Sequence, residues 1–203
     1  MIVLTEGRPR IIRPIVDGAS AILMAYNPGN GGGEAIADIL FGDVNPSGKL
    51  PITYPRWPNM LFTYDHKTFF GNEDVAPLYV PQFEFGFGLS YTTFAYSDLQ
   101  VTQAGAPGHR KIQVAVTVKN TGARAGKEVV ELYLNEEFAS ITPPLKRLKR
   151  FAKLSLEPGE SRRCAFELLP EDLSFINAEN KRVVEPGVFD VRIGGLTQSF
   201  EWK

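Results

Sequence analysis

The sequence has few of the side chains that bind metals or form disulfides. Its 203 residues include one cysteine and two histidines. The single cysteine, Cys164, cannot form an internal disulfide, and these residues are too few for a Cys/His zinc site. Cys164 stands in an alternating apolar run, which favours a small buried hydrophobe. The sequence therefore predicts no metal site.

An excess of one charge and long apolar runs are also absent. The formal net charge is −1, from 22 Lys and Arg against 23 Asp and Glu. This balance favours neither nucleic acid nor an anionic membrane surface as a partner. No apolar run approaches the roughly 20 residues that span a bilayer. We therefore expect no nucleic-acid partner and no membrane partner.

The first 50 residues predict alternating strands and helices. Residues 2–4 and 21–26 are continuous apolar runs, typical of parallel strands that are covered on both faces. A short helix is a candidate at 9–16. A second is expected at about 34–40, with Gly42 as its C-terminal stop. Two strands alone cannot form a stable sheet, so this segment needs partner strands from elsewhere.

Residues 51–93, which we call the strap, are rich in proline, glycine and aromatic rings and show little periodicity. So long an irregular stretch is unusual inside a compact domain. Its rings would form a large apolar patch if they were exposed. We therefore expect the strap to lie across other protein surface.

Residues 94–203 have the pattern of short antiparallel strands. Ile112, Val114, Val116 and Val118 alternate with more polar residues, the period of a half-buried strand. Similar runs cover 130–134, 164–168 and 189–193, with turn signals between them. This spacing predicts an antiparallel β-sandwich.

The basic run at 145–151 lies within this region. If it is a strand, Leu145, Leu148 and Phe151 are expected to turn inward and the lysines and arginines outward. Such charges protect a sheet edge from aggregation.

Three separated motifs resemble one enzyme family. They are GNGGGEAIADILFGDVNPSGKLP at 29–51, FGFGLSYTTF at 85–94 and VTVKNTG at 116–122. In this order they resemble the C-terminal part of a glycoside hydrolase of family 3, the β-glucosidase and β-xylosidase type, and the resemblance covers nearly the whole chain. It implies a mixed fold class. Residues 1–50 would be the C-terminal piece of an α/β sandwich domain, and 94–203 an all-β, immunoglobulin-like sandwich of the fibronectin type III-like kind.

The resemblance also implies a function. Enzymes of this family hydrolyse terminal β-linked sugars and are far longer than this chain. Their nucleophile aspartate lies in an N-terminal barrel, and their acid/base glutamate, where known, lies upstream of the segment that resembles residues 2–9. Both positions would precede Met1, so no catalytic residue is carried over and the chain alone is expected to be inactive. The implied partners are the N-terminal barrel-containing portion of the same enzyme and a glycoside or oligosaccharide substrate.

The residues themselves offer two further candidates for chemistry. The glycine run at 29–33 either cradles an anion at a helix N-terminus or makes a tight strand-to-helix turn. It lacks the Lys-Ser/Thr ending of a phosphate loop, which favours the turn, and no cofactor is predicted. Glycosidases use two carboxyl groups about 5–10 Å apart. The pair Glu34 and Asp38, one helical turn apart, is expected to face solvent.

Residues 64–70 form the only cluster that mixes a histidine, a carboxylate and aromatic rings. Aromatic faces with polar neighbours suit sugar binding. Asp65, His66, Phe69 and Phe70 are therefore candidate substrate-binding residues. The alternative is that the rings pack within the protein and that Asp65 and His66 are solvated.

A second class of function is a non-enzymatic β-sandwich module that binds carbohydrate or protein. The segment 1–50 argues against it, because an independent binding module has no reason to carry half an α/β sheet.

Overall fold

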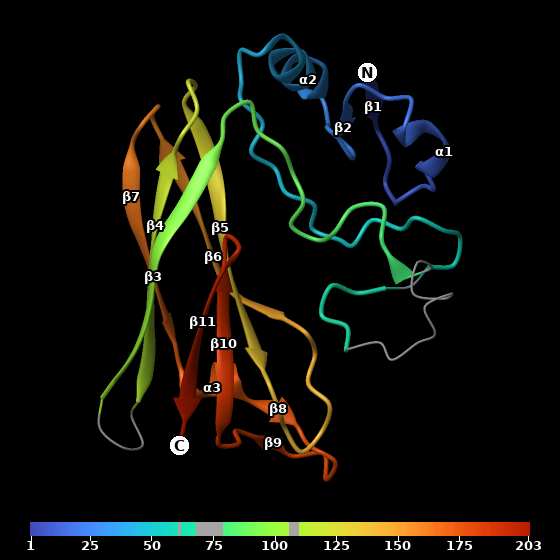
Figure 1. The fold of residues 1–203 in the computed structure, drawn as a ribbon. Coiled ribbons are helices and arrows are strands. Elements are labelled where there is room, and N and C mark those ends of the chain that lie inside the picture. Colours follow the sequence, from blue (N-terminus) through green and yellow to red (C-terminus); the bar gives the residue numbers. More distant parts are fainter. Residues whose placement is uncertain (61, 68–78, 106–109) are drawn as a thin grey trace. The chain divides into compact units, whose positions relative to one another are not determined.

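The computed structural model describes residues 1–60, 62–67, 79–105 and 110–203 (Figure 1). The chain divides into two compact units. The described residues of the first unit are 1–60, 62–64 and 79–89, and those of the second are 65–67, 90–105 and 110–203.

The first unit has the predicted order of strand, helix, strand and helix. Its elements are β1 (Ile2–Leu4), α1 (Arg13–Val16), β2 (Ile22–Met24) and α2 (Gly32–Phe41). β1 and β2 pair in parallel and form a sheet of two strands among the described residues. Every residue of both strands is half-buried. The unit therefore has a parallel sheet of the expected type, but its strands are only partly covered by other residues.

The glycine run before α2 forms a tight strand-to-helix turn. Gly29 has a φ of 70°, in the left-handed region that glycine adopts without strain. A Cβ on Gly32 would overlap the ring of Pro28. α2 ends at Gly42, which has a φ of 86° and donates its N–H to the carbonyl oxygens of Asp38 and Ile39. The two ends of the helix are thus set by glycines at fixed places in the sequence.

The first motif and the beginning of the second are joined in this unit. Leu50 donates its N–H to the Phe87 carbonyl at 2.9 Å and accepts the N–H of Gly86 at 2.8 Å. The Lys49 Nζ donates to the Gly88 carbonyl at 2.6 Å. Gly88 has no room for a Cβ because the carbonyl of Gly48 lies against it. This close approach explains the glycine at position 88 of the second motif.

The described part of the strap in the first unit packs through its own rings. Tyr54 meets Phe83 edge to face with ring centres 6.2 Å apart, and Phe83 stacks on Phe87 at 5.1 Å. Tyr64 stacks on Phe85 at 4.3 Å. Tyr54 is fully buried. This aromatic packing orders a segment that has almost no regular secondary structure.

The second unit is the predicted antiparallel sandwich. One sheet has the order β3-β4-β7 and the other the order β11-β10-β5-β6. The strands are β3 (Phe94–Ala104), β4 (Lys111–Asn120), β5 (Gly126–Glu136), β6 (Arg147–Leu156), β7 (Ser161–Leu168), β10 (Gly187–Ile193) and β11 (Leu196–Trp202). A short helix, α3 (Pro170–Leu173), and a small hairpin of β8 (Phe175–Ile176) and β9 (Arg182–Val183) follow β7.

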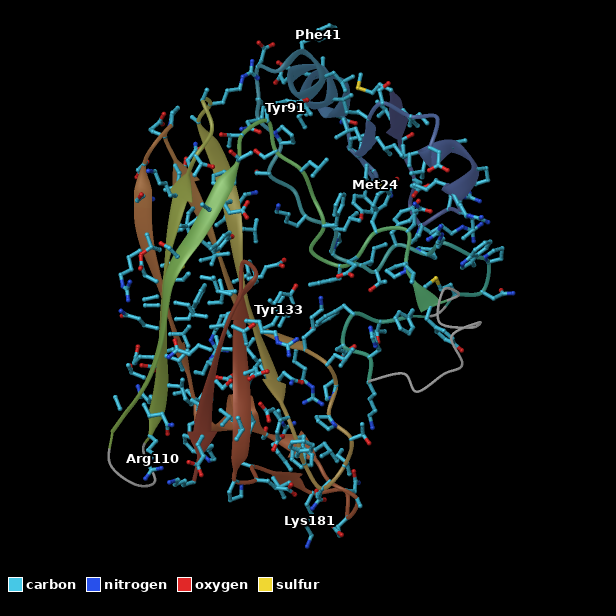
Figure 2. All side chains as sticks on the ribbon, in the orientation of Figure 1. Met24, Phe41, Tyr91, Arg110, Tyr133 and Lys181 are labelled. Atoms are coloured by element: carbon cyan, nitrogen blue, oxygen red, sulfur yellow. The ribbon has the colours of Figure 1, made fainter. Side chains whose placement is uncertain are left out.

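The core of the sandwich lies between its two sheets. Side chains from both sheets fill this space (Figure 2). Ile112, Val114, Val116 and Val118 of β4 are all buried, as their alternation predicts. The predicted fold class is therefore confirmed: an α/β segment is followed by an all-β sandwich.

The end of the second motif and the third motif are joined around Asn120, which is fully buried. Its Oδ1 accepts hydrogen bonds from the Thr92 hydroxyl at 2.7 Å and the Gly122 N–H at 3.1 Å. Its Nδ2 donates to the carbonyls of Arg124 at 2.7 Å and Leu156 at 3.0 Å. A Cβ on Gly122 would overlap Thr92. The two motifs therefore form one hydrogen-bonded junction.

The expected orientation of the basic run is wrong. Phe151 is 69% exposed and Leu145 is 36% exposed. β5 and β6 pair with an irregularity between Leu132 and Tyr133, so Lys149 is an extra residue in the ladder. Phe151 lies opposite Glu131, on the face away from the core. The extra residue places Leu148, opposite Tyr133, on the same outward face as Phe151.

Candidate functional site

Two of the predicted sugar-binding residues, Asp65 and His66, lie in the second unit, where both are half-buried. The His66 backbone carbonyl accepts the N–H of Leu145 at 2.9 Å, and Lys67 forms an antiparallel bridge with Pro144. The His66 Nδ1 lies 2.9 Å from the Lys67 carbonyl. A carbonyl only accepts, so Nδ1 carries a proton and donates it to this hydrogen bond.

The other two candidates, Phe69 and Phe70, lie outside the described residues. The side chain of Asp65 makes no hydrogen bond or ion pair within the part of the chain that the structure describes. The loop thus presents a carboxylate and an oriented imidazole, two groups that can bind hydroxyls.

A second polar cluster lies at the carboxyl ends of the parallel strands, where ligands bind in many α/β folds. Glu6 follows β1 and accepts the Tyr54 hydroxyl at 2.8 Å, and the Tyr54 oxygen accepts the N–H of Arg10 at 3.2 Å. Tyr26 follows β2 with a φ of 51°, and its buried hydroxyl has no partner among the described residues. The sequence analysis missed this cluster, although a carboxylate directly after an apolar strand was a signal for it.

The pKa values of the two tyrosines indicate a structural role. Burial, together with the hydrogen bond to Glu6, raises the pKa of Tyr54 to about 12. Burial, then the nearby charge of Glu6, also raises the pKa of Tyr26. Both hydroxyls stay protonated at neutral pH, and neither is a suitable acid for glycoside chemistry. Glu6 holds the fully buried Tyr54 in place.

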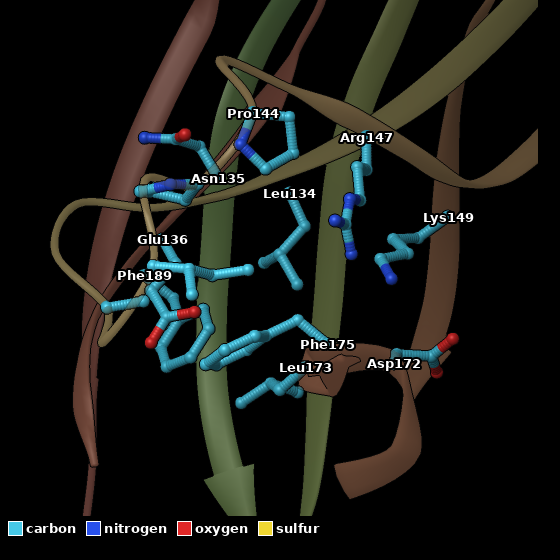
Figure 3. A pocket seen from close by; sticks show the side chains of 13 residues that line it. Leu134, Asn135, Glu136, Pro144, Arg147, Lys149, Asp172, Leu173, Phe175 and Phe189 are labelled. Carbon is cyan, nitrogen blue, oxygen red and sulfur yellow. The ribbon is translucent and has the colours of Figure 1, made fainter. Parts of the chain in front are cut away.

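A small pocket lies at the end of β5 in the second unit (Figure 3). Apolar side chains such as Leu134, Phe175 and Phe189 line it together with the charged groups of Glu136 and Arg147. Its volume is about 30 Å³. This is room for one or two water molecules and far too little for a sugar ring.

Glu136 is unusual within this pocket because it stands on the inward face of β5, in register with Phe189. It is 8% exposed, and its Oε1 has no hydrogen-bond partner among the described residues. Burial, with a contribution from the charge of Glu185, raises its pKa to about 7. The positive charge of Arg147 partly offsets this rise in the pKa of Glu136.

The described residues offer no arrangement suited to a metal or to membrane insertion. Within residues 1–60, 62–67, 79–105 and 110–203, no three His, Cys, Asp or Glu side chains come together as a metal site would require. In the same ranges, no helix has the length and apolar character needed to cross a bilayer.

Comparison with known proteins assigns both units. The profile of the glycosyl hydrolase family 3 C-terminal domain matches residues 1–91, and that of a fibronectin type III-like domain matches residues 128–197. A β-xylosidase of Formosa agariphila is 37% identical over 100% of this chain. The chain belongs to glycoside hydrolase family 3.

Two further relatives agree with this assignment. A periplasmic β-glucosidase of Salmonella typhimurium is 40% identical over 96% of the chain. The solved structure of a β-glucosidase from Listeria innocua in complex with isofagomine superposes on 98% of the chain with a TM-score of 0.87 and 32% identity. The chain spans 29% of the length of the Formosa relative, 27% of the Salmonella relative and 30% of the Listeria structure.

In this family 3 chain, the three motifs that carry the resemblance have structural tasks. The first motif and Gly86 to Gly88 fix the backbone of the first unit, and Thr92 with Asn120 fixes the start of the sandwich. The predicted sugar-binding residues lie outside all three motifs.

Proposed function

We propose that the chain is the C-terminal portion of a family 3 glycoside hydrolase that removes terminal β-linked sugars, with a structural and accessory role. One observation carries this proposal. The chain aligns over 96–100% of its length with β-glucosidases and β-xylosidases but spans only 24–29% of the length of these relatives. The small pocket volume supports a role outside the chemistry itself.

The proposed partner is the N-terminal, barrel-containing portion of the same enzyme. β1 and β2 pair only with each other among the described residues, and a sheet of two strands is marginal by itself. Further strands beside them would complete an α/β sheet. This need also argues against the alternative of an independent β-sandwich module that binds carbohydrate or protein. Such a module would have no use for the first unit.

The test is hydrolysis of aryl β-glucosides and β-xylosides by the purified chain. We expect no turnover from the chain alone. Activity should appear when the N-terminal portion is supplied, and it should depend on a carboxylate of that portion. Turnover by the chain alone that is lost in Glu6→Gln would contradict the proposal.

We further propose that Asp65, His66, Phe69 and Phe70 border the sugar site of the complete enzyme. The support is chemical: an available carboxylate and an oriented imidazole suit hydroxyl groups, and neighbouring rings suit the apolar face of a sugar. Such contacts orient the substrate and perform no chemistry. Loss of one neutral hydrogen bond should therefore lower kcat/KM by about 2- to 13-fold.

Kinetics of Asp65→Ala, His66→Ala and Phe70→Ala in the complete enzyme, on disaccharides and longer substrates, test this assignment. Phe138→Ala is the matched control, since it removes a ring that is 82% exposed. Unchanged kinetics for all three variants would assign the loop to ordinary surface.

A further inference from the structure

The strap forms a short piece of β-structure with the loop between β5 and β6. Lys67 bridges to Pro144, and the Leu145 N–H donates to the His66 carbonyl at 2.9 Å. Pro143 and Pro144 have no N–H, so Leu145 is the only backbone donor within 143–145. Among the described residues, the Leu145 amide thus ties the backbone of His66 to the sandwich.

Asn135 of β5 holds this loop in place. Its amide nitrogen faces two carbonyl oxygens and donates to Pro144 at 2.8 Å and Leu145 at 3.1 Å. Carbonyl oxygens only accept, so the nitrogen and not the oxygen of the amide must face them. The backbone of Asn135 is fixed in turn by its pairing with Asp190 of β10. Figure 3 shows Asn135 and Pro144 side by side at the edge of the small pocket.

These contacts form a continuous path from a central strand of the sandwich to the strap. β5 carries Asn135, Asn135 fixes the carbonyls on either side of the Leu145 amide nitrogen, and Leu145 fixes His66. The path acts through the backbone of the strap.

We propose that Asn135 and Leu145 are positioning residues for substrate binding, through which the sandwich holds Asp65 and His66 at the sugar site. This inference rests on the proposed sugar-site role of these two residues. It gives the fibronectin type III-like unit a defined task in the enzyme: it adds a strand-like support to a substrate-binding loop.

Two matched pairs of variants isolate this task. Leu145→Pro removes the N–H that binds His66, whereas Leu145→Ala keeps it. Asn135→Ala removes an amide that donates to backbone carbonyls. Gln103→Ala removes an amide of the same kind on β3, whose Nε2 donates to the carbonyl of Glu201 on β11 at 2.7 Å.

The first measurement uses the 203-residue chain and hydrogen exchange of single backbone amides. Asn135→Ala should speed exchange of the Leu145 amide by about 2- to 13-fold, the range expected for loss of one supporting hydrogen bond. Gln103→Ala should leave the Leu145 amide unchanged. Equal exchange of this amide in both variants would overturn the positioning role of Asn135.

The second measurement uses steady-state kinetics of the complete enzyme on disaccharides. Leu145→Pro and Asn135→Ala should raise KM by about 2- to 13-fold with kcat unchanged, because a misplaced loop weakens substrate and transition state alike. Leu145→Ala and Gln103→Ala should keep the original KM. The KM of the double variant Leu145→Pro with His66→Ala should be little higher than that of the more impaired single variant, because both changes act through His66.

The outcomes separate this inference from the proposed sugar site. If Asp65→Ala and His66→Ala raise KM while Leu145→Pro and Asn135→Ala do not, the positioning role is overturned and the sugar site stands. If none of the four variants changes KM, both proposals are overturned. A higher KM in Leu145→Pro but not in Leu145→Ala supports the positioning role beyond a general loss of stability.

Discussion

Asn120 is the single residue on which the start of the sandwich most depends. All four hydrogen-bonding positions of its buried amide are used, and they join Thr92, Gly122, Arg124 and Leu156. Removal of the amide leaves buried backbone carbonyls without donors, which is more costly than loss of an exposed bond.

Asn120→Ala should therefore lower the free energy of unfolding by about 2–4 kcal/mol, measured by urea denaturation. Asn177→Ala is the control, because the Asn177 Oδ1 accepts the backbone N–H groups of Glu179 and Lys181 in a surface turn. Asn177→Ala should lower the free energy of unfolding by about 1 kcal/mol or less. Equal losses in the two variants would contradict a special role for the buried amide.

Glu136 gives the sandwich a pH-dependent stability. Its pKa rises from the ordinary value of 4.5 to about 7 in the folded protein, first because it is buried and then because of Glu185. The charged groups around it are Glu185, Arg147, Lys149 and the Arg150-paired Asp172. Between pH 4.5 and 7 the folded state binds more protons than the unfolded state, so this contribution to stability is lost as pH rises through that window.

Glu136→Gln removes this ionisation and should flatten the pH dependence of the free energy of unfolding. The unfolding free energy of the variant relative to the original protein should rise between pH 5 and pH 8, as measured by urea denaturation at both values. The exposed Glu179→Gln is the matched control and should not change the dependence. If the free energy of unfolding falls equally with rising pH in the original protein and in Glu136→Gln, this role is ruled out.

At the scale of single elements, β6 shows how the two-residue period of a strand divides its side chains between two faces. Phe151 and Leu156 lie in the regular part of its pairing with β5 and are five residues apart, so they stand on opposite faces: Phe151 is 69% exposed and Leu156 is 1% exposed. Two large apolar residues of one strand therefore have very different environments.

Phe151→Ser should change the free energy of unfolding by no more than about 0.5 kcal/mol, as for other exposed positions. Leu156→Ala should cost about 2–5 kcal/mol, because it leaves a cavity in the core. Denaturant titration of both variants provides the measurement. A loss above about 2 kcal/mol for Phe151→Ser would place this ring inward and contradict the observed register.

At the scale of the whole molecule, the question is where the sandwich begins. The sequence predicts a division into 1–50, 51–93 and 94–203, and this division stays a prediction. The second motif is shared between the two units, since 85–89 belong to the first and 90–94 to the second. Thr92 and Thr93 pair with Asn120 and Thr121.

Two truncated chains locate the boundary. A chain of residues 90–203 should unfold cooperatively, because it keeps the buried junction around Asn120. A chain of residues 94–203 lacks Thr92 and Thr93, and we expect it to be less stable by about 1–3 kcal/mol. Equal midpoints and slopes in urea for the two chains would place the boundary at 94 and remove any role for the junction.

Local pattern was enough to predict several elements. The alternation at Ile112–Val118 predicted β4, and continuous apolar runs predicted β1 and β2. Glycines at 29–33 and 42 predicted the limits of α2 to within two residues. These predictions succeed because strand period, helix period and the backbone freedom of glycine act between neighbours in the sequence. The motifs predicted the family, and the comparisons confirm it.

The sequence by itself thus determined the order of elements in the first unit, the inward faces of β4, β5, β7 and β10, and the family. The tertiary structure alone decided the exposure of Phe151, the burial of Glu136 and the pairing of His66 with Leu145. Each of these depends on which distant segment lies alongside: β5 pairs Glu131 with Phe151, β10 pairs Phe189 with Glu136, and the loop after β5 pairs with the strap. Contacts between segments far apart in the chain leave no periodic signal in either segment, because neither one encodes the position of the other.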